Sequence, residues 1–586
     1  AYIAKPSLAD EEVHLQIKML DNWASANGLL GMDDGERRLP LWGMDPALWK
    51  VTSGNPGGGR YVFAKRLATS ESSFEVLCSS SRTTPVFHFA EGGGGSIACD
   101  QLGISPVYWV SFPNHILVAS RSRFLVEREN RRLDLNSVFH YLNFSTVPTP
   151  FSILQGVNRL APGCILEVGS GGRLKTFWDL RYGEKSTASA NVSAPALFEK
   201  IRDAVHRTTE GSDFSALGAF LSGGTDSTTV AAFAAEAIGQ PLDVFSIVFE
   251  DQAVSEEPFM QAAAQRFPLR RHSFQLDQAA FLNALEPIRN AYDEPYANSS
   301  VYAAYYCFQM ACDAGKKCLL AGDGGDEIFG GNERYLKDRF FATYAALPSW
   351  LKAVLEFPLE SFQVRSHAAN RLRKMFRRAR MPNPDRFYAD TEFASAHWNE
   401  LPGPAFRDHP IAADASLKHV RELYRNCSAG DELHRLLYLD MKLAIADNDL
   451  LKITRCGTMF GIEPRFPFLD LELVEYANQI PASLKLKWLQ KRYLFKKAMR
   501  GYLPDEILFK RKQGMGLPLG SWLRDSGPVS AYAKERLMDK AAGNLFSRRY
   551  LDKIWTQHLA GEWDYSEDLW RIVVLVEWCA THGSIA

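Results

Sequence analysis

The chain has 586 residues, of which 46% are hydrophobic and 23% are charged, and its formal net charge is −1 at pH 7. This composition is typical of a globular protein with two or more domains. The balanced charge excludes a protein that is drawn as a whole to nucleic acid or to an acidic membrane surface. No apolar run approaches the roughly 20 residues of a membrane-spanning helix.

The cysteine content and the start of the sequence bear on the cellular compartment. Nine cysteines are scattered along the chain without the paired spacing of a zinc site. Such a sparse, odd-numbered set is typical of a reducing compartment. The first residues do not contain the apolar segment of a signal peptide. We therefore expect a cytoplasmic protein.

The N-terminal third is predicted to be rich in strands. Alternating apolar residues indicate strands, and glycine clusters near 57–59 and 92–95 mark turns. The small polar segment 185–194 is predicted to be a linker. The predicted domains are therefore 1–184 and 195–586. The predicted strands of the first domain lie at 60–64, 85–89, 107–110, 115–119 and 164–168.

Beyond the linker, helices and buried strands alternate. A helix over 195–209 precedes an apolar strand, and a helix over 225–238 follows it and ends at Gly239. Near-continuous apolar runs at 243–249 and 318–321 are expected of strands buried on both faces. This alternation predicts a parallel, doubly wound sheet whose ligands bind at the carboxyl ends of its strands. From about residue 340 onward the pattern is mainly helical.

The turn 222–227 (SGGTDS) joins the first of these strands to its helix. Its two glycines leave backbone N–H groups free to face an anion at the helix N-terminus, and its hydroxyl groups add donors. The carboxylate of Asp226 would repel a phosphate unless a divalent cation lay between them. We interpret the turn as a cradle for nucleotide phosphates, with Mg²⁺ on Asp226. The alternative is a junction that binds nothing.

A second glycine-rich turn follows the strand at 318–321. The sequence of 322–331 is GDGGDEIFGG, which crowds the carboxylates of Asp323, Asp326 and Glu327 at one strand end. Three carboxylates this close repel one another unless something cationic is bound. A solvated acidic turn is the alternative interpretation.

Together the two turns resemble those of the asparagine synthetase family, whose synthetase domain uses an S-G-G-x-D-S pyrophosphate loop. Further segments resemble that family in the same order along the chain: DEP at 293–295, EPRFPFLD at 463–470 and RKQGMGLP at 511–518. The resemblance extends from about residue 210 to the C-terminus. It is weaker over 97–180, where 100–108 (DQLGISPVY) is similar to a family segment.

The resemblance implies both a fold and a reaction. The N-terminal domain would be an α+β, β-rich domain similar to Ntn (N-terminal nucleophile) hydrolases. The C-terminal domain would be an α/β PP-loop domain, similar to adenine nucleotide α-hydrolases, with a large helical extension. The implied reaction joins ATP and a carboxylate into an acyl adenylate with release of pyrophosphate. An amine nitrogen then displaces AMP to form an amide.

The resemblance also implies roles for individual residues. Asp226 and Asp326 would hold Mg²⁺, and Lys512 would bind the α-phosphate or the leaving pyrophosphate as a point charge. Asp323 matches an acidic position tied to adenylate formation. Leu221 and Ile247 also suit the core of any fold, and Lys512 also suits a solvated loop. The positions that match ATP-binding residues of the family are Leu221, Ser222, Gly223, Gly224, Asp226, Ser227, Ile247, Ala321 and Gly322.

Two departures from the family pattern affect the nitrogen source and the substrate. Members that use glutamine begin with a catalytic Cys, whereas this sequence begins with Ala1, and their N-G-E-x-Y-N segment is not found. The first cysteines, Cys78 and Cys99, lie deep in the domain. We expect a degenerate glutaminase domain, as in β-lactam synthetases and lasso-peptide cyclases. Thr454 stands where the family usually has an acidic residue, which puts aspartate in doubt as the substrate.

These observations predict an ATP-dependent amide ligase without its own glutaminase. Its substrate would be a small-molecule or peptide carboxylate that carries or meets an amine. The alternatives are an asparagine synthetase that uses ammonia or glutamine, and a catalytically silent ATP-binding scaffold in a biosynthetic complex. Partner proteins of a biosynthetic pathway are compatible with this prediction, whereas nucleic acid and membranes are not expected. The basic segment 365–380 could receive an acidic peptide or carrier, although such a run is more often a solvated helix face.

Overall fold

The structure is a computed structural model that describes residues 2–4, 86–89, 95–112, 115–126, 131–168, 172–183, 189–249, 256–361, 367–389, 393–510 and 517–582. The predicted strand at 60–64, Cys78 and Lys512 lie outside these ranges. Among the described residues, no helix has the length and apolar character needed to cross a membrane.

The N-terminal region contains two antiparallel sheets, as its alternating sequence predicts. Four of the five predicted strands form within a residue or two of their expected bounds, and the fifth lies outside the described ranges. One sheet has the order β1 (Tyr2–Ala4), β5 (His115–Ala119), β4 (Tyr108–Ser111) and β6 (Asn158–Arg159). The other has the order β2 (Val86–Phe89), β3 (Gly95–Ala98), β7 (Cys164–Val168) and β8 (Arg173–Thr176).

The helix that follows the predicted linker begins earlier than its sequence indicates. Helix α3 spans Ala190–Thr209 and contains Pro195, which was predicted to be its first residue. Pro195 lies beyond the first turn of this helix, and because it has no N–H it leaves the carbonyl four residues earlier without its usual donor. The second half of the predicted linker, 190–194, is therefore helical, and the predicted domain boundaries stay a prediction.

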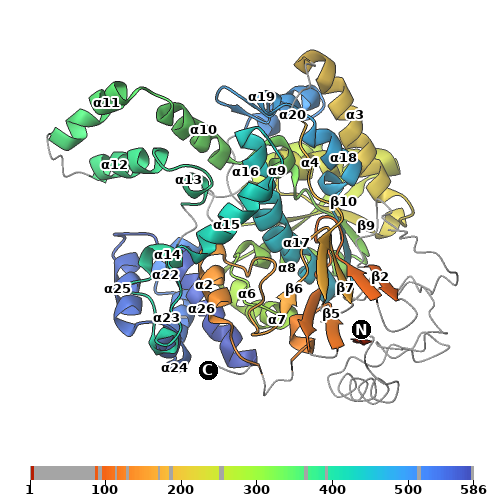
Figure 1. The fold of residues 1–586 in the computed structure, drawn as a ribbon. Coiled ribbons are helices and arrows are strands. Elements are labelled where there is room, and N and C mark those ends of the chain that lie inside the picture. The colour runs from red at the N-terminus through yellow and green to blue at the C-terminus, as the bar shows by residue number, and fades with distance from the viewer. Residues whose placement is uncertain are drawn as a thin grey trace.

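A five-stranded parallel sheet forms the centre of the C-terminal region (Figure 1). Three of its strands were predicted from their apolar sequences. The short β13 and the polar, half-exposed β11 were not. The order of the strands is β11 (Leu269–Gln275), β10 (Leu242–Val248), β9 (Leu217–Phe220), β12 (Cys318–Leu320) and β13 (Glu463–Arg465).

Helices cover both faces of this sheet. Figure 1 shows α4 (Thr225–Ile238) and α8 (Ser300–Asp313) on opposite sides of the strands. Helix α4 ends at Gly239, whose φ of 64° is the left-handed conformation predicted for a helix stop. Strand β9 has β10 on one side and β12 on the other, so the chain reverses its direction across the sheet there. A reversal of this kind opens a crevice at the carboxyl ends of the strands.

The remainder of the C-terminal region is mainly helical, as predicted. A π-helix, η5 (Met441–Asp449), leads into α17 (Leu450–Phe460). Helices α10 (Glu333–Ala345), α11 (Ser349–Ser361) and α12 (His367–Ala379) form an arm that projects from the body (Figure 1). The other helices of eight or more residues are α2 (Leu135–Phe144), α5 (Glu257–Arg266), α15 (Ala415–Asn426), α16 (Glu432–Asp440), α18 (Leu471–Asn478), α23 (Pro528–Met538), α25 (Arg548–Leu559) and α26 (Ser566–His582).

Buried carboxylates join the N-terminal region to the C-terminal region. Asp293 forms ion pairs with Arg121 (3.0 Å) and Arg123 (3.2 Å) from the N-terminal region and with Arg455 (3.0 Å) of α17. Its neighbour Glu294 accepts a hydrogen bond from the Ile153 N–H at 2.9 Å, and burial raises the pKa of Glu294 to about 7. The DEP segment at 293–295 therefore forms part of the junction between the two regions.

The π-helix contributes a second such contact. Asp447 accepts hydrogen bonds from the Thr149 N–H at 3.0 Å and from the Thr149 hydroxyl at 2.5 Å. Arg159 Nη1 lies 3.3 Å from the same carboxylate, and both side chains of this ion pair are buried. The π-helix η5, which leads into α17, is thus held by the N-terminal region.

One buried lysine in the helical extension forms no ion pair of this kind within the described part of the chain. Lys485, in α19 (Ala482–Lys485), is buried, and its Nζ has no hydrogen-bond partner within the described part of the chain. The centre of the Tyr182 ring lies 5.7 Å from its Nζ. Burial lowers the pKa of Lys485 to about 7. The folded state therefore disfavours the charged form of this side chain.

We expect Lys485→Met to stabilise the protein at pH 7 by about 2–4 kcal/mol. The unfolded lysine titrates near pH 10.4, so the folded protein binds fewer protons between pH 7 and 10.4, and the wild type loses stability as the pH falls through that range. Denaturant unfolding at several pH values measures the effect. The exposed Lys487→Met is the matched control. A variant that is no more stable than the wild type would contradict the prediction.

Candidate functional site

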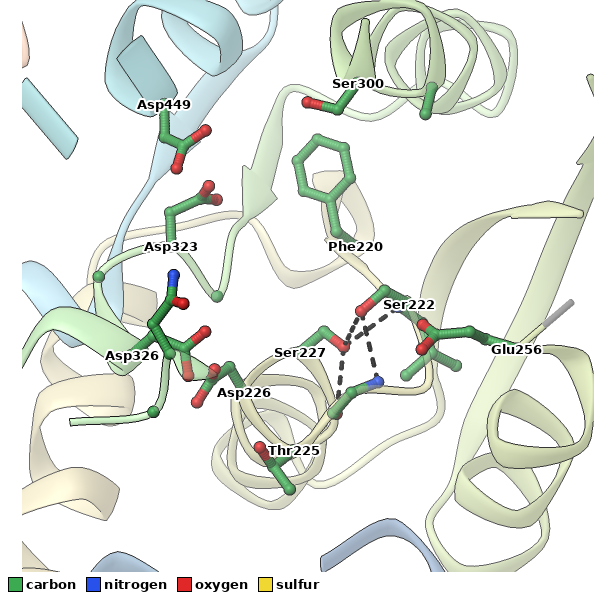
Figure 2. Close-up of a pocket in the computed structure, with 18 of the residues that line it drawn as sticks. Phe220, Ser222, Thr225, Asp226, Ser227, Glu256, Ser300, Asp323, Asp326 and Asp449 are labelled. Atoms are coloured by element: carbon green, nitrogen blue, oxygen red, sulfur yellow. Dashed lines mark hydrogen bonds between the residues drawn. The ribbon is translucent and has the colours of Figure 1, made fainter. Parts of the chain in front are cut away.

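The turn between β9 and α4 is braced by its own hydroxyl groups. The Ser222 N–H donates to Ser227 Oγ at 3.1 Å, and the Gly224 N–H donates to Ser222 Oγ at 3.4 Å. The two serine hydroxyls lie 3.0 Å apart (Figure 2). The prediction that the N–H groups of the turn are free is therefore wrong for Ser222 and Gly224. These hydrogen bonds fix the path of the turn at the N-terminus of α4.

Close packing explains the glycines of the two turns. Gly223 has a φ of +70°, and a Cβ there would lie 3.0 Å from Phe259 Cβ. In the second turn, a Cβ on Gly322 would lie 2.9 Å from the Ser227 N atom, and one on Gly325 would lie 2.5 Å from Asp226 Oδ1. Such distances are too short for real side chains. The absence of side chains lets the two turns touch each other.

This contact brings Asp226 and Asp326 together around one guanidinium group. Arg492 Nη1 lies 2.8 Å from Asp226 Oδ2, 3.3 Å from Asp326 Oδ1 and 3.0 Å from Thr225 Oγ1. Its Nη2 also donates to Asp226 Oδ1, so Asp226 binds the guanidinium through both oxygens. Arg492 is buried, and its guanidinium carbon lies 4.0 Å from the centre of the Phe495 ring. The two carboxylates that were predicted to bind metal therefore do converge.

The turns form the floor of a cavity of about 590 Å³. Figure 2 shows Asp226 and Asp326 on one side of this cavity and Ser222 and Ser227 near its base. Apolar side chains from β9, β10 and α8 line one wall, among them Phe220, Phe245 and Ile247. Lys510 also lines the cavity, and its ammonium group lies 2.7 Å from Glu256 Oε1. A polar floor beside an apolar wall suits a ligand with a charged end and a flat apolar end.

A second group of charges lies at another part of the cavity. Lys452 Nζ is 2.6 Å from Asp449 Oδ1 and 3.8 Å from Asp323 Oδ1. Figure 2 shows the Asp449 and Asp323 carboxylates side by side. Burial raises the pKa of Asp323, Lys452 opposes that shift, and Asp449 adds to it. Although burial alone would lower the pKa of Lys452, Asp449 and Asp323 hold it above its usual value.

The third carboxylate of the acidic turn is held differently. Burial raises the pKa of Glu327 well above its ordinary value, and Asp440 and Asp449 add to the shift. A raised pKa favours the neutral, protonated form of this side chain. Arg492 beside Asp326, Lys452 beside Asp323 and the raised pKa of Glu327 all reduce the repulsion that the sequence predicts among the three carboxylates.

The structure places most of the predicted site residues around this one cavity. Ala321 and Gly223 are next to it but do not line it. Thr454 does not line it either, and its hydroxyl donates to the Leu450 carbonyl within α17 at 2.6 Å. The assignment of Lys512 stays a prediction. The predicted residues that line the cavity are Leu221, Ser222, Gly224, Asp226, Ser227, Ile247, Gly322, Asp323 and Asp326.

Several charged residues of the cavity were not predicted, among them Asp449, Lys452, Arg492 and Lys510. Lys510 stands in the basic run beside Lys512, which was a weak signal for it. The other three lie in helical or hairpin segments that contain no glycine-rich motif. Only the folded chain brings them to the two turns.

Asp226 and Asp326 are suitable ligands for a magnesium ion. Carboxylate oxygens are the ligands that Mg²⁺ prefers, and one or two carboxylates together with substrate phosphates are a common set. Both carboxylates lie within 3.3 Å of a single nitrogen atom, so one cation can contact both. Within the described part of the chain, no group of three or more His, Cys, Asp or Glu side chains is arranged to hold a metal ion. The remaining ligands would therefore have to come from substrate and water.

Comparison with known proteins identifies the family. The model of the family described as "Asparagine synthase" matches residues 196–580, which is more than half of the chain. The chain belongs to the asparagine synthase family. A second model, "Glutamine amidotransferase domain", matches residues 87–178. The resemblance that the two glycine-rich turns indicate is thereby confirmed.

Individual relatives agree with this family assignment. The asparagine synthetase [glutamine-hydrolyzing] 1 of Bacillus subtilis is 24% identical over 497 residues, which cover 82% of this chain and 74% of the relative. A putative asparagine synthetase [glutamine-hydrolyzing] of Mycobacterium bovis is 26% identical over 499 residues, with the same coverage. A more distant relative, the amidase chyE of Penicillium rubens, is 21% identical over 430 residues, which cover 66% of this chain and 62% of the relative. Membership of the asparagine synthase family supports an ATP-dependent carbon–nitrogen ligase.

Proposed function

We propose that this member of the asparagine synthase family adenylates a substrate carboxylate and releases pyrophosphate, after which an amine displaces AMP. The observation that carries the proposal is the convergence of Asp226 and Asp326, from two different turns, on the guanidinium group of Arg492. The opposed charges of two carboxylates and one guanidinium suit a triphosphate with its metal ion. ATP would lie with its phosphates on the floor of the cavity and its adenosine against the apolar wall.

The floor of the cavity would offset the negative charge of the phosphate groups during the reaction. A carboxylate that attacks an α-phosphate meets a group that is itself negative, so cations lower the barrier. Asp226 and Asp326 would hold Mg²⁺, which when bound withdraws charge from the phosphate oxygens. Arg492 and Lys510 already lie at this floor, and Lys512 is two residues beyond Lys510. These side chains would stabilise the departing pyrophosphate.

The charged group of Asp323, Lys452 and Asp449 would serve the second step of the reaction, in which an amine displaces AMP from the acyl group. An ammonium group must lose a proton before its nitrogen can attack. A carboxylate with a raised pKa accepts that proton more readily than an ordinary aspartate. Asp323 is the less exposed of the two carboxylates in this group, and the ammonium group of Lys452 lies 3.8 Å away. We assign Asp323 to proton acceptance and Lys452 to the orientation of both carboxylates.

We also propose that the N-terminal domain keeps an Ntn-hydrolase-like scaffold but does not hydrolyse glutamine. The N-G-E-x-Y-N segment that holds glutamine in the family is not found in the sequence. Of the two cysteines in the described part of this domain, Cys99 is buried, and burial raises the pKa of its thiol well above the ordinary value. A thiol with a raised pKa is a poor nucleophile at neutral pH. The nitrogen would then come from an amine on a substrate or from ammonia.

Asparagine synthesis is the second candidate. It is favoured by the match of the glutamine amidotransferase model to residues 87–178 and by the names of the Bacillus and Mycobacterium relatives. Thr454 argues against it only weakly, because this side chain does not line the cavity. A catalytically silent scaffold is less well supported, since the charged residues of both turns are in place.

Pyrophosphate release from Mg·ATP distinguishes these functions. We expect release in the presence of a carboxylate other than aspartate, with AMP as the nucleotide product. A suitable panel contains amino acids, β-amino acids and short peptides, and hydroxylamine traps the activated acyl group as a hydroxamate. Asparagine made from aspartate and ammonium would support the second candidate and contradict the expectation of a carboxylate other than aspartate. ATP binding without turnover across the panel would support the scaffold.

A further inference from the structure

Two elements that start at the cavity carry unusually exposed apolar side chains. The hairpin of β14 (Leu486–Lys487) and β15 (Gln490–Lys491) has Trp488 and Leu489 at its tip, and these are 80% and 84% exposed. They are the most exposed large apolar residues in the described part of the chain. Lys491 and Arg492, at the other end of the hairpin, line the cavity. The tip thus stands in solvent next to the site.

The second element is the arm of α10, α11 and α12. Helix α10 begins directly after Asn332 and its first residue is Glu333, both of which line the cavity. Trp350, Val354 and Phe357 on α11 are 68%, 61% and 60% exposed. Their spacing of four and three residues places them on one face of the helix. An apolar face left open to water is typical of an interaction site.

The hairpin and the arm are fastened to each other. Arg339 Nη1 of α10 donates to the Leu486 carbonyl at 2.7 Å, and Glu333 forms an ion pair with Lys491. Leu486 packs in one hydrophobic cluster with Tyr335 of α10. The hairpin is therefore fastened to α10, the helix through which the arm that carries the exposed face of α11 joins the cavity.

The apolar face of α11 is not used by the packing of the arm itself. Helices α10 and α12 meet through a small core that contains Phe341, Tyr344 and Phe376. Glu356 of α11 turns to this side, where it contacts the Tyr344 hydroxyl and Arg380. Trp350, Val354 and Phe357 are thus left for a partner outside the arm.

The charge of the arm limits the kind of partner. The sequence of α12 contains five Lys or Arg residues and no Asp or Glu. One of them, Arg377, is exposed in the structure. An apolar helix face beside an excess of positive charge complements a polypeptide that combines large apolar side chains with carboxylates.

We propose that the hairpin tip and the exposed face of α11 form a docking surface for an acidic polypeptide that delivers its carboxylate to the cavity. This inference rests on the proposed function and adds that the acyl substrate is part of a peptide or protein. The polypeptide would bury Trp488, Leu489, Trp350, Val354 and Phe357. Because the base of the hairpin and the start of α10 line the cavity, a chain bound there is held near the site of adenylation.

Selection from a random phage-displayed peptide library on the full chain tests the inference. We expect the enriched sequences to be rich in Asp and Glu and to carry large apolar residues at helical or alternating spacing. Fluorescence anisotropy with a labelled enriched peptide then measures binding. The double variants Trp350→Ser/Phe357→Ser and Trp488→Ser/Leu489→Ser should each weaken binding at least about tenfold, which is the effect expected for central apolar anchors. The matched controls Trp563→Ser and Val192→Ser remove exposed apolar side chains elsewhere and should bind like the wild type.

Several outcomes would overturn the docking surface. These are enrichment of basic peptides, the absence of any enrichment, and binding that both double variants retain. Binding of the wild type, but not of the variants, to vesicles of phosphatidylcholine and phosphatidylglycerol would assign the surface to a membrane instead. A dimer that the substitutions dissociate in sedimentation would assign it to a second copy of this chain. Mg·ATP binding, measured on the same preparations, separates these failures from a failure of the proposed function.

Discussion

Pyrophosphate release is expected to fall by about three orders of magnitude when Asp226 is replaced by asparagine. The substitution keeps the shape of the side chain and one of its two hydrogen bonds from Arg492 but removes the negative charge that would hold Mg²⁺. Gly325 and Gly322 pack against this position, so a side chain of the same size preserves the contact between the two turns. We expect a loss of turnover with little change in the free energy of unfolding.

A steady-state pyrophosphate assay at increasing Mg²⁺ concentrations checks this expectation. If Asp226 holds the metal, the variant should also need more Mg²⁺ for half of its remaining activity. Asp213→Asn is the matched control, because Asp213 is exposed and precedes β9 at the opposite end of the sheet. Pyrophosphate release at the wild-type rate in Asp226→Asn would contradict the proposal that Asp226 holds Mg²⁺.

The largest loss of stability is expected from Asp293→Asn, at about 3–5 kcal/mol. The Asp293 carboxylate is 1% exposed and is the shared partner of Arg121, Arg123 and Arg455. Asparagine fills the same space but carries no charge, so three guanidinium groups would be left close together without an anion between them. Their repulsion and desolvation would oppose folding of the junction.

Denaturant unfolding measures this loss. Asp385→Asn is the control, since Asp385 pairs with an Arg421 side chain that is 40% exposed and should contribute less than about 1 kcal/mol. The double variant Asp293→Asn/Arg123→Met should recover part of the stability by removing one of the stranded charges. A loss for Asp293→Asn no larger than that of the control would show that the arginines find other partners.

The parts of the site that follow from local sequence were predictable. Glycine and hydroxyl residues at 222–227 predict a turn at a helix N-terminus, because only such residues allow this backbone and supply its hydrogen bonds. The apolar strands before both turns predict that the turns lie at the same edge of the sheet. Asp226 and Asp326 could therefore be assigned to one site from the sequence.

The cations of the site were not predictable in the same way. Arg492 is 266 residues away from Asp226 along the chain, and a lysine–arginine pair on a hairpin has no signal that separates it from a solvated pair. Lys452 and Asp449 lie where a π-helix becomes an α-helix, and the extra residue per turn of a π-helix changes which side chains share a face. Strand β11 was missed because its alternating polar residues reflect an exposed edge of the sheet.

The junction around Asp293 and Asp447 has a consequence for how the chain can lose functions. Arg121, Arg123, Arg159 and Thr149 of the N-terminal region satisfy carboxylates that belong to the synthetase region. Deleting the first region would leave Asp447 without these partners and Asp293 with Arg455 alone, whereas point substitutions elsewhere in that region would not disturb these contacts. A change of chemistry in the N-terminal region can therefore occur by point substitution, whereas loss of the whole region would disturb the synthetase region.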